Sequence, residues 1–139
     1  MRACPDVNVL IHAANPASAS GDSARDFLRV SMSTGLLLLP DVASSFCRIV
    51  TNPRIFQTPS SMAQARSVID ALLARAGVIL AAPSPRRLSI MFGLCADHGI
   101  AGDEVADAYL VAGAIDAGAQ FATFDRRLAR LGPKAVRVL

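Results

Sequence analysis

The stretch from Gly102 to Asp125, GDEVADAYLVAGAIDAGAQFATFD, decides how the rest of the chain is arranged. Its first part has the apolar spacing of a buried helix, and a glycine turn and a short apolar strand follow. Two acids, Asp103 and Asp107, lie one helical turn apart on the face that carries the apolar side chains. A third acid, Asp125, comes directly after the strand. The stretch therefore predicts acidic side chains at the edge of a buried core.

Acids on a buried face are costly for a folded protein. Two carboxylates about 4 Å apart repel by roughly 4 kcal/mol at an effective dielectric constant of 20. Burial adds a desolvation penalty, so either a cation or a raised carboxyl pKa is expected here. Because the carboxyl ends of strands are where open α/β sheets hold ligands, we expect Asp125 to lie at a binding site.

The remainder of the chain alternates strand-like and helix-like segments. We expect strands in the opening segment 3–11 and at 36–39, 78–81, 120–124 and 136–139, helices at 22–32, 42–50, 62–76, 88–98 and 126–131, and a turn at 83–85. This alternation predicts one α/β domain over residues 1–139, a three-layer α/β/α fold around a mostly parallel sheet of four to five strands. We expect Asp22 to cap its helix, and Gly77 and Gly99 to end theirs.

One further acid stands in the first predicted strand, where Asp is disfavoured unless it has a local role. Right-handed crossovers allow this residue, Asp6, to lie beside Asp107 and Asp125, with Asp103 near the rim. A turn or helix cap is the alternative role for Asp6. An all-oxygen ligand set selects a hard cation, Mg²⁺ or Mn²⁺, and such a site supports phosphoryl chemistry without a nucleophilic side chain.

Other features restrict the function. The chain has no credible Ser/His/Asp or Cys/His set and no glycine-rich phosphate loop. Its formal charge of +3 permits a polyanionic partner. The three cysteines have neither metal-ligand nor CxxC spacing, and no apolar run approaches the roughly 20 residues that cross a bilayer. We expect reduced cysteines and a cytoplasmic protein.

Four segments together resemble one family. They are DVNVLIH at the start, FxRxxTNPRxF (Phe46, Arg48, Thr51, Asn52, Pro53, Arg54 and Phe56), GDEVADAYLVAGA and ATFDRRL. In this order and spacing they resemble the PIN-domain toxins of the VapC family, over essentially the whole chain. The resemblance implies a PIN fold, Mg²⁺-dependent endoribonuclease activity, toxin homodimers and neutralisation by a small VapB-type antitoxin.

The resemblance also assigns residues by position. Asp6, Asp107 and Asp125 match the family's catalytic and metal-binding acids. Asp103 is a further candidate ligand from its place in the sequence, with helix capping as its alternative role. The family places a glutamate on the helix that leads to Arg48, whereas residues 43–45 of this chain are Ala-Ser-Ser. We expect Asp41, at the start of this helix, to act as a helix cap, and partial substitution for the missing acid is its alternative role.

Four polar residues are candidates for contacts with RNA: Asn8, Thr123, Arg48 and Arg54. Backbone contacts for the first two, and internal ion pairs for the two arginines, are the alternatives. Apolar side chains expected to form a partner surface are Phe27, Ile55, Phe56 and Met62. Two other functions stay open: a PIN-like module that binds RNA or a partner without cleaving because the glutamate is missing, and a DNA-directed nuclease, since phosphate contacts do not identify the sugar.

Overall fold

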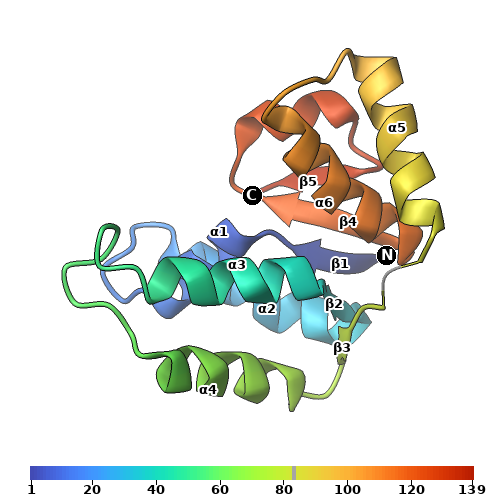
Figure 1. Cartoon of the computed structure of the whole chain (residues 1–139). Helices are drawn as coiled ribbons and strands as arrows, with labels where there is room; N and C mark the ends of the chain where they lie inside the picture. Colours follow the sequence, from blue (N-terminus) through green and yellow to red (C-terminus); the bar gives the residue numbers. More distant parts are fainter. Residues whose placement is uncertain (83) are drawn as a thin grey trace.

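The computed structural model of the chain describes residues 1–82 and 84–139. The elements follow in the order β1 (Arg2–Pro5), α1 (Val7–Ala14), α2 (Gly21–Thr34), β2 (Leu36–Leu38), α3 (Pro40–Val50), α4 (Met62–Leu73), β3 (Val78–Leu80), α5 (Arg86–His98), α6 (Glu104–Asp116), β4 (Ala119–Thr123), the 3₁₀ helix η1 (Arg126–Leu131) and β5 (Val136–Val138) (Figure 1). The turn expected at 83–85 includes Pro83, which lies outside the described residues.

The strands form one five-stranded sheet in the order β3-β2-β1-β4-β5, and every pair is parallel. The central strands pair in the register Cys4 with Phe121, and both of these side chains are fully buried. Strand β2 is buried along its whole length, as an interior strand of a parallel sheet must be. The predicted α/β fold with a parallel sheet is confirmed.

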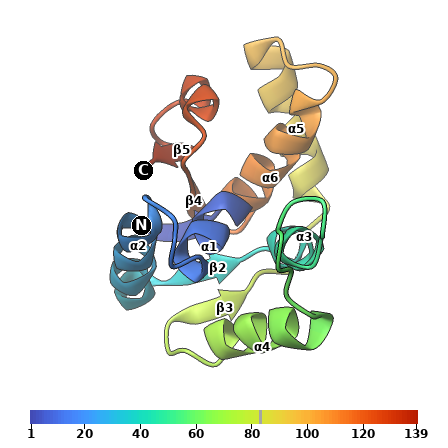
Figure 2. The ribbon, with the colours of Figure 1, turned by 90° about the vertical axis from the view of Figure 1, so that its left-hand side faces the viewer.

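Helices cover both sides of the sheet. Helices α5 and α6 pack against each other on one side, with α6 on β4, and α2 packs on the other side against β1 and β2 (Figure 2). The chain moves outward from the centre in one direction through β2 and β3 and in the other through β4 and β5. The strand order therefore reverses between β1 and β4, which is where such sheets bind ligands.

The opening segment differs from the prediction. The strand ends at Pro5, and residues 7–14 form helix α1 instead of continuing the strand to residue 11. Asp6 causes the change of direction, because its Oδ1 accepts the N–H of Val7 at 2.7 Å and caps the helix. The short apolar run fits either a strand or a helix by pattern alone, and the cap decides between them.

Several helix boundaries also differ. Ser20, not Asp22, occupies the cap position of α2. Helix α3 begins two residues earlier than expected, at Pro40, since proline suits the first turn of a helix. Helix α4 ends at Leu73, so Gly77 does not end it. Gly77 has φ +85° in the following turn, and a Cβ there would lie 2.0 Å from the Met32 carbonyl oxygen.

Candidate active site

Asp6 lies between the end of β1 and the start of α1, and it is 8% exposed. Its backbone N–H donates to the Ala122 carbonyl at 2.8 Å, which fixes the end of β1 against β4. One carboxylate oxygen, Oδ1, accepts from the Val7 N–H. The other, Oδ2, accepts from the Thr123 hydroxyl at 2.6 Å and from the Asn8 amide at 3.2 Å. Asp6 is thus a buried carboxylate held in one orientation.

Thr123 and Asn8 connect this carboxylate to the end of β4. The Thr123 hydroxyl, which is fully buried, donates to Asp6 and accepts from the Asn8 amide at 3.0 Å and from the Asp125 N–H at 3.0 Å. Asn8 Oδ1 accepts from the Phe124 N–H at 3.2 Å. These contacts use all the hydrogen-bonding capacity of the hydroxyl. In this structure both side chains orient Asp6 and the loop that carries Asp125.

Asp107 and Asp125 join Asp6 electrostatically. Burial raises the pKa of the Asp6 carboxyl, the hydrogen bonds from Thr123 and Val7 lower it, and the charges of Asp107 and Asp125 raise it further. Burial also raises the pKa of Asp107, and the charge of Asp125 adds to this effect. The acids come from the end of β1, the first turn of α6 and the cap position of η1, two residues after β4, so three separate elements place them near one another.

Asp125 differs from the other two acids because it forms an ion pair with Arg127. Arg127 Nε donates to both carboxylate oxygens, at 3.0 Å and 3.2 Å, and Nη2 donates to Oδ2 at 2.7 Å. The Arg127 backbone N–H also donates to Oδ1, so Asp125 caps η1. The guanidinium therefore lowers the pKa of Asp125.

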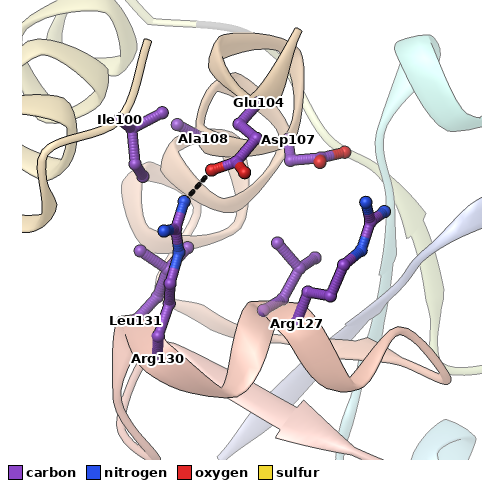
Figure 3. Close-up of a pocket in the computed structure, with 8 residues that line it drawn as sticks. Ile100, Glu104, Asp107, Ala108, Arg127, Arg130 and Leu131 are labelled. Atoms are coloured by element: carbon purple, nitrogen blue, oxygen red, sulfur yellow. Dashed lines mark hydrogen bonds and ion pairs between the residues drawn. The ribbon is translucent and has the colours of Figure 1, made fainter.

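A pocket of about 210 Å³ lies between α6 and η1, and of the three acids Asp107 lines it. Asp107, Glu104, Arg127 and Arg130 contribute its charged side chains, and its apolar lining consists of Ile100, Ala108, Leu128 and Leu131. Arg130 forms an ion pair with Glu104, whereas the Arg127 guanidinium lies on the side of the Asp107 carboxylate (Figure 3). Both acidic and basic groups thus face one opening.

The donor chemistry of the site fits a hard divalent cation. Asp6, Asp107 and Asp125 supply only carboxylate oxygens, and their mutual repulsion is what a bound cation relieves. As the side chains are arranged, however, no three of the described His, Cys, Asp and Glu residues are grouped closely enough to hold a metal ion. The Asp125 carboxylate faces Arg127 instead.

Among the described residues, no side-chain hydrogen bond or ion pair joins the remaining charged site candidates to this group. Asp103 is exposed at the cap position of α6, and its side chain makes no capping hydrogen bond. Arg48 is exposed on α3, and Arg54 is exposed in the turn after it. Among the described residues, neither arginine forms an ion pair with an acid.

Asp41 does not replace the missing glutamate, and it does not cap α3, where Leu39 holds the cap position. Its carboxylate accepts from Arg87 Nη1 at 2.8 Å. Arg87 reaches it from α5, is only 3% exposed, donates from Nε to the Tyr109 carbonyl at 3.0 Å and lies 3.7 Å above the Tyr109 ring. The acid near the start of α3 is thus committed to an ion pair with a buried guanidinium.

Sequence reasoning gave no role to Arg127 or Arg87. One signal for Arg87 was present: Gly113 interrupts an otherwise apolar helix, which indicates close approach by another group. A Cβ at Gly113 would lie 2.8 Å from Arg87 Cζ and Nε. Arg127 follows Asp125 by two residues, a spacing that predicts no helical pair.

The fold places the protein in a class. The five-stranded parallel sheet in the order β3-β2-β1-β4-β5 matches the fold of PIN-domain structures. The structure is similar to that of VapBC2 from Rickettsia felis bound to a DNA fragment from its promoter, with a TM-score of 0.70 over 99% of this chain and 98% of that chain at 17% identity. At this identity the likeness shows the fold alone.

Sequence similarity to curated proteins defines the family. The chain is 36% identical to ribonuclease VapC43 of Mycobacterium tuberculosis over 129 residues, which are 91% of this chain and 88% of that protein. It is 32% identical to ribonuclease VapC25 of the same organism over 90% of this chain and 89% of that protein. No family model matches the chain. The chain belongs to the VapC ribonuclease family, as the resemblance predicted.

Proposed function

We propose that the chain is a divalent-cation-dependent endoribonuclease and the toxin of a toxin–antitoxin pair. The observation that carries the proposal is the group Asp6, Asp107 and Asp125, three carboxyls from separate elements that lie near enough for their charges to affect one another. Membership of the VapC ribonuclease family supports RNA as the substrate. The domain extends over residues 1–139 in this proposal.

The same three acids would hold Mg²⁺ or Mn²⁺. A divalent ion bound there supplies a water of lowered pKa and neutralises charge that develops on the phosphate oxygens. The chain itself positions the ligands. Thr123 and Asn8 hold the buried carboxylate of Asp6 in one orientation, and the first turn of α6 presents Asp107 at the pocket. Asp103, which is exposed four residues before Asp107, is a further candidate ligand in this proposal.

Cleavage of single-stranded RNA by the purified chain tests this function. We expect cleavage with Mg²⁺ or Mn²⁺ and none with excess chelator. Asp107→Asn should reduce the rate more than about 100-fold, because even partners outside the ligand shell of a metal contribute 10–100-fold. Asp97→Asn changes an exposed acid on α5 and should leave the rate unchanged. Cleavage that survives both the chelator and Asp107→Asn would contradict the proposal.

We also propose a small antitoxin as a protein partner, which docks in an apolar groove between α1, α3 and α4. This groove has a volume of about 230 Å³, and its lining includes Ile11, Phe46, Val50, Phe56 and Val68. Ile55 and Met62 are exposed, as expected of a partner surface. Phe27 is buried, so it cannot contribute.

A charge in this groove tests the partner surface. Val68 is 45% exposed, so Val68→Asp should leave the fold and RNA cleavage intact while it prevents co-purification with the product of an adjacent small gene. Val30→Asp places the same charge at a similarly exposed position on α2, outside the groove, and should not affect co-purification. Equal retention of the partner by the two variants would show that the groove is not the docking surface.

The chain also presents apolar groups to a second copy in our proposal of a homodimer. Strand β3 is an edge strand with Ile79 and Leu80 about half exposed, and Leu88 and Phe92 are exposed one turn apart on α5. Unpaired strand edges and apolar patches favour association. Light scattering of the purified chain distinguishes a dimer from a monomer.

One observation favours a second function, a module that binds RNA or a partner without cleaving. Residues 43–45 provide no acid, and the nearest one, Asp41, is paired with Arg87. A site with fewer ligands binds a metal more weakly. If the chain binds RNA but its melting temperature does not respond to millimolar Mg²⁺ or Mn²⁺, the binding module is the better account, since a ligand of the native state must stabilise it.

A further inference from the structure

We propose that Arg127 has two partners in turn: it holds the Asp125 carboxylate while the site is metal-free, and it binds a phosphate of the RNA once a metal ion has taken Asp125. The inference rests on the proposed function, and it adds a substrate-binding residue that neither the sequence pattern nor the family assignment identified.

Arg127 engages both carboxylate oxygens of Asp125. Its Oδ1 accepts from the backbone N–H and Nε of Arg127, and its Oδ2 accepts from Nε and Nη2. A metal ion shared with Asp6 and Asp107 needs at least one of these oxygens, and it also repels the guanidinium. Metal and Arg127 therefore compete for the same carboxylate.

The ion pair between Arg127 and Asp125 can break without disturbing the fold. The Arg127 side chain is 79% exposed, and ion pairs in contact with solvent are weak. The backbone N–H of Arg127 keeps its own bond to Asp125 Oδ1, so the cap of η1 does not depend on the guanidinium. Release of the side chain leaves the fold in place.

The released guanidinium stays at the pocket beside Asp107. Arg127 and Arg130 supply the basic groups of this pocket, but Arg130 is paired with Glu104 on α6 (Figure 3). A guanidinium matches the geometry of a phosphate group with two parallel hydrogen bonds. Next to the carboxylate group, Arg127 is thus placed to meet a phosphate of RNA that enters the site.

Metal affinity tests the first half of the inference. Calorimetric titration of the folded chain with Mn²⁺ should show binding about fivefold tighter for Arg127→Ala than for the unaltered chain, the size expected for loss of one exposed ion pair. Arg126→Ala removes the same charge from the neighbouring exposed residue of η1 and should leave the affinity unchanged.

RNA binding tests the second half. Anisotropy of a labelled phosphorothioate RNA should show that Arg127→Ala weakens binding roughly tenfold in Mn²⁺. The negative slope of log affinity against log salt should become shallower by about 0.7, the value for one phosphate contact on a single strand. In chelator the variant should bind as the unaltered chain does, because Asp125 then holds Arg127. Arg126→Ala should change the affinity for RNA by the same factor in Mn²⁺ and in chelator.

The outcomes separate the two proposals. Suppose that the unaltered chain cleaves RNA, so that the proposed function holds. The two-partner role is then overturned by an unchanged metal affinity in Arg127→Ala, or by a loss of RNA binding that is equal with metal and with chelator. An unaltered chain that neither binds Mn²⁺ nor cleaves RNA overturns the proposed function and this inference together.

Discussion

Asp6 has two roles that impose opposite demands on its carboxyl group. As the cap of α1 and the acceptor for Thr123 and Asn8, it is best ionised, because hydrogen bonds from N–H and O–H groups favour the charged form. Burial and the charges of Asp107 and Asp125 favour the neutral form, and the net effect raises its pKa. The charged form of Asp6 is therefore less favourable in the folded chain than in the unfolded chain when no cation is present.

This imbalance predicts a pH dependence. A carboxyl whose folded pKa lies above its unfolded pKa binds protons more readily in the folded state, so its contribution to stability falls as pH rises through the folded pKa. Asp6→Asn retains the cap, but its amide nitrogen cannot accept from Thr123 and Asn8, so the substitution has a cost that does not depend on pH. We expect the melting temperature of the variant in chelator, relative to that of the unaltered chain, to rise by several degrees between pH 4 and neutral pH, since 1 kcal/mol shifts it by about 3–6 °C. A difference in melting temperature that stays constant over this pH range would contradict this account.

At this scale the acids were selected from their positions in the sequence, and their role as a site stays a prediction. Asp6 lies within a predicted strand, and Asp125 directly follows one. Asp107 shares a helical face with core residues. Their relation to Arg127 was not predictable, because the contact depends on the 3₁₀ turn that follows Asp125. Nothing in the pair Arg126-Arg127 indicates which guanidinium folds back onto the acid.

At the scale of elements, Arg87 joins three helices at one point. It extends from α5 to the carboxylate of Asp41 on α3 and to the Tyr109 carbonyl on α6, and Gly113 supplies the space it occupies. Within the described part of the chain, Arg87 Nη2 is buried without a hydrogen-bond partner, so the arrangement carries a cost. Helix α6 bears Asp107, so this joint also fixes one side of the site.

A double-mutant cycle measures the coupling energy between Gly113 and Arg87. Gly113→Ala should destabilise the chain by about 1–3 kcal/mol in urea unfolding, because the new methyl group overpacks a guanidinium held on two sides. In an Arg87→Ala background the same change should cost almost nothing. Gly93→Ala on α5 meets no atom within 4 Å and should stabilise by roughly 0.5–1 kcal/mol. Equal costs of Gly113→Ala in the two backgrounds would show that Arg87 does not fill this space.

Most elements were predictable from apolar spacing and caps, and α1 was not. The strand at 36–38 and the left-handed Gly99 that ends α5 follow from local chemistry that the sequence displays. Residues 7–14 contain β-branched side chains that fit a strand equally well. Their helical state depends on the cap at Asp6 and on the packing of Val9 and Leu10 in the core, which are tertiary effects.

For the whole molecule, the order of the strands accounts for the position of the site. With β1 and β4 adjacent at the centre, the residues that follow them, Asp6 and Asp125, lie at the point where the chain reverses direction across the sheet. No described helix is long and apolar enough to cross a bilayer. Alternation of elements predicted the parallel sheet, but the order of its strands follows only from long-range pairing.

The central claim is that Asp6, Asp107 and Asp125 bind one divalent cation at this point. The most direct measurement is an anomalous difference map from crystals of the chain soaked in Mn²⁺. The account predicts a peak within coordination distance, about 2.0–2.4 Å, of an oxygen from each of the three carboxylates, with Arg127 turned away from Asp125. A map without a peak among these acids, from a chain that cleaves RNA in the same Mn²⁺ concentration, would contradict it.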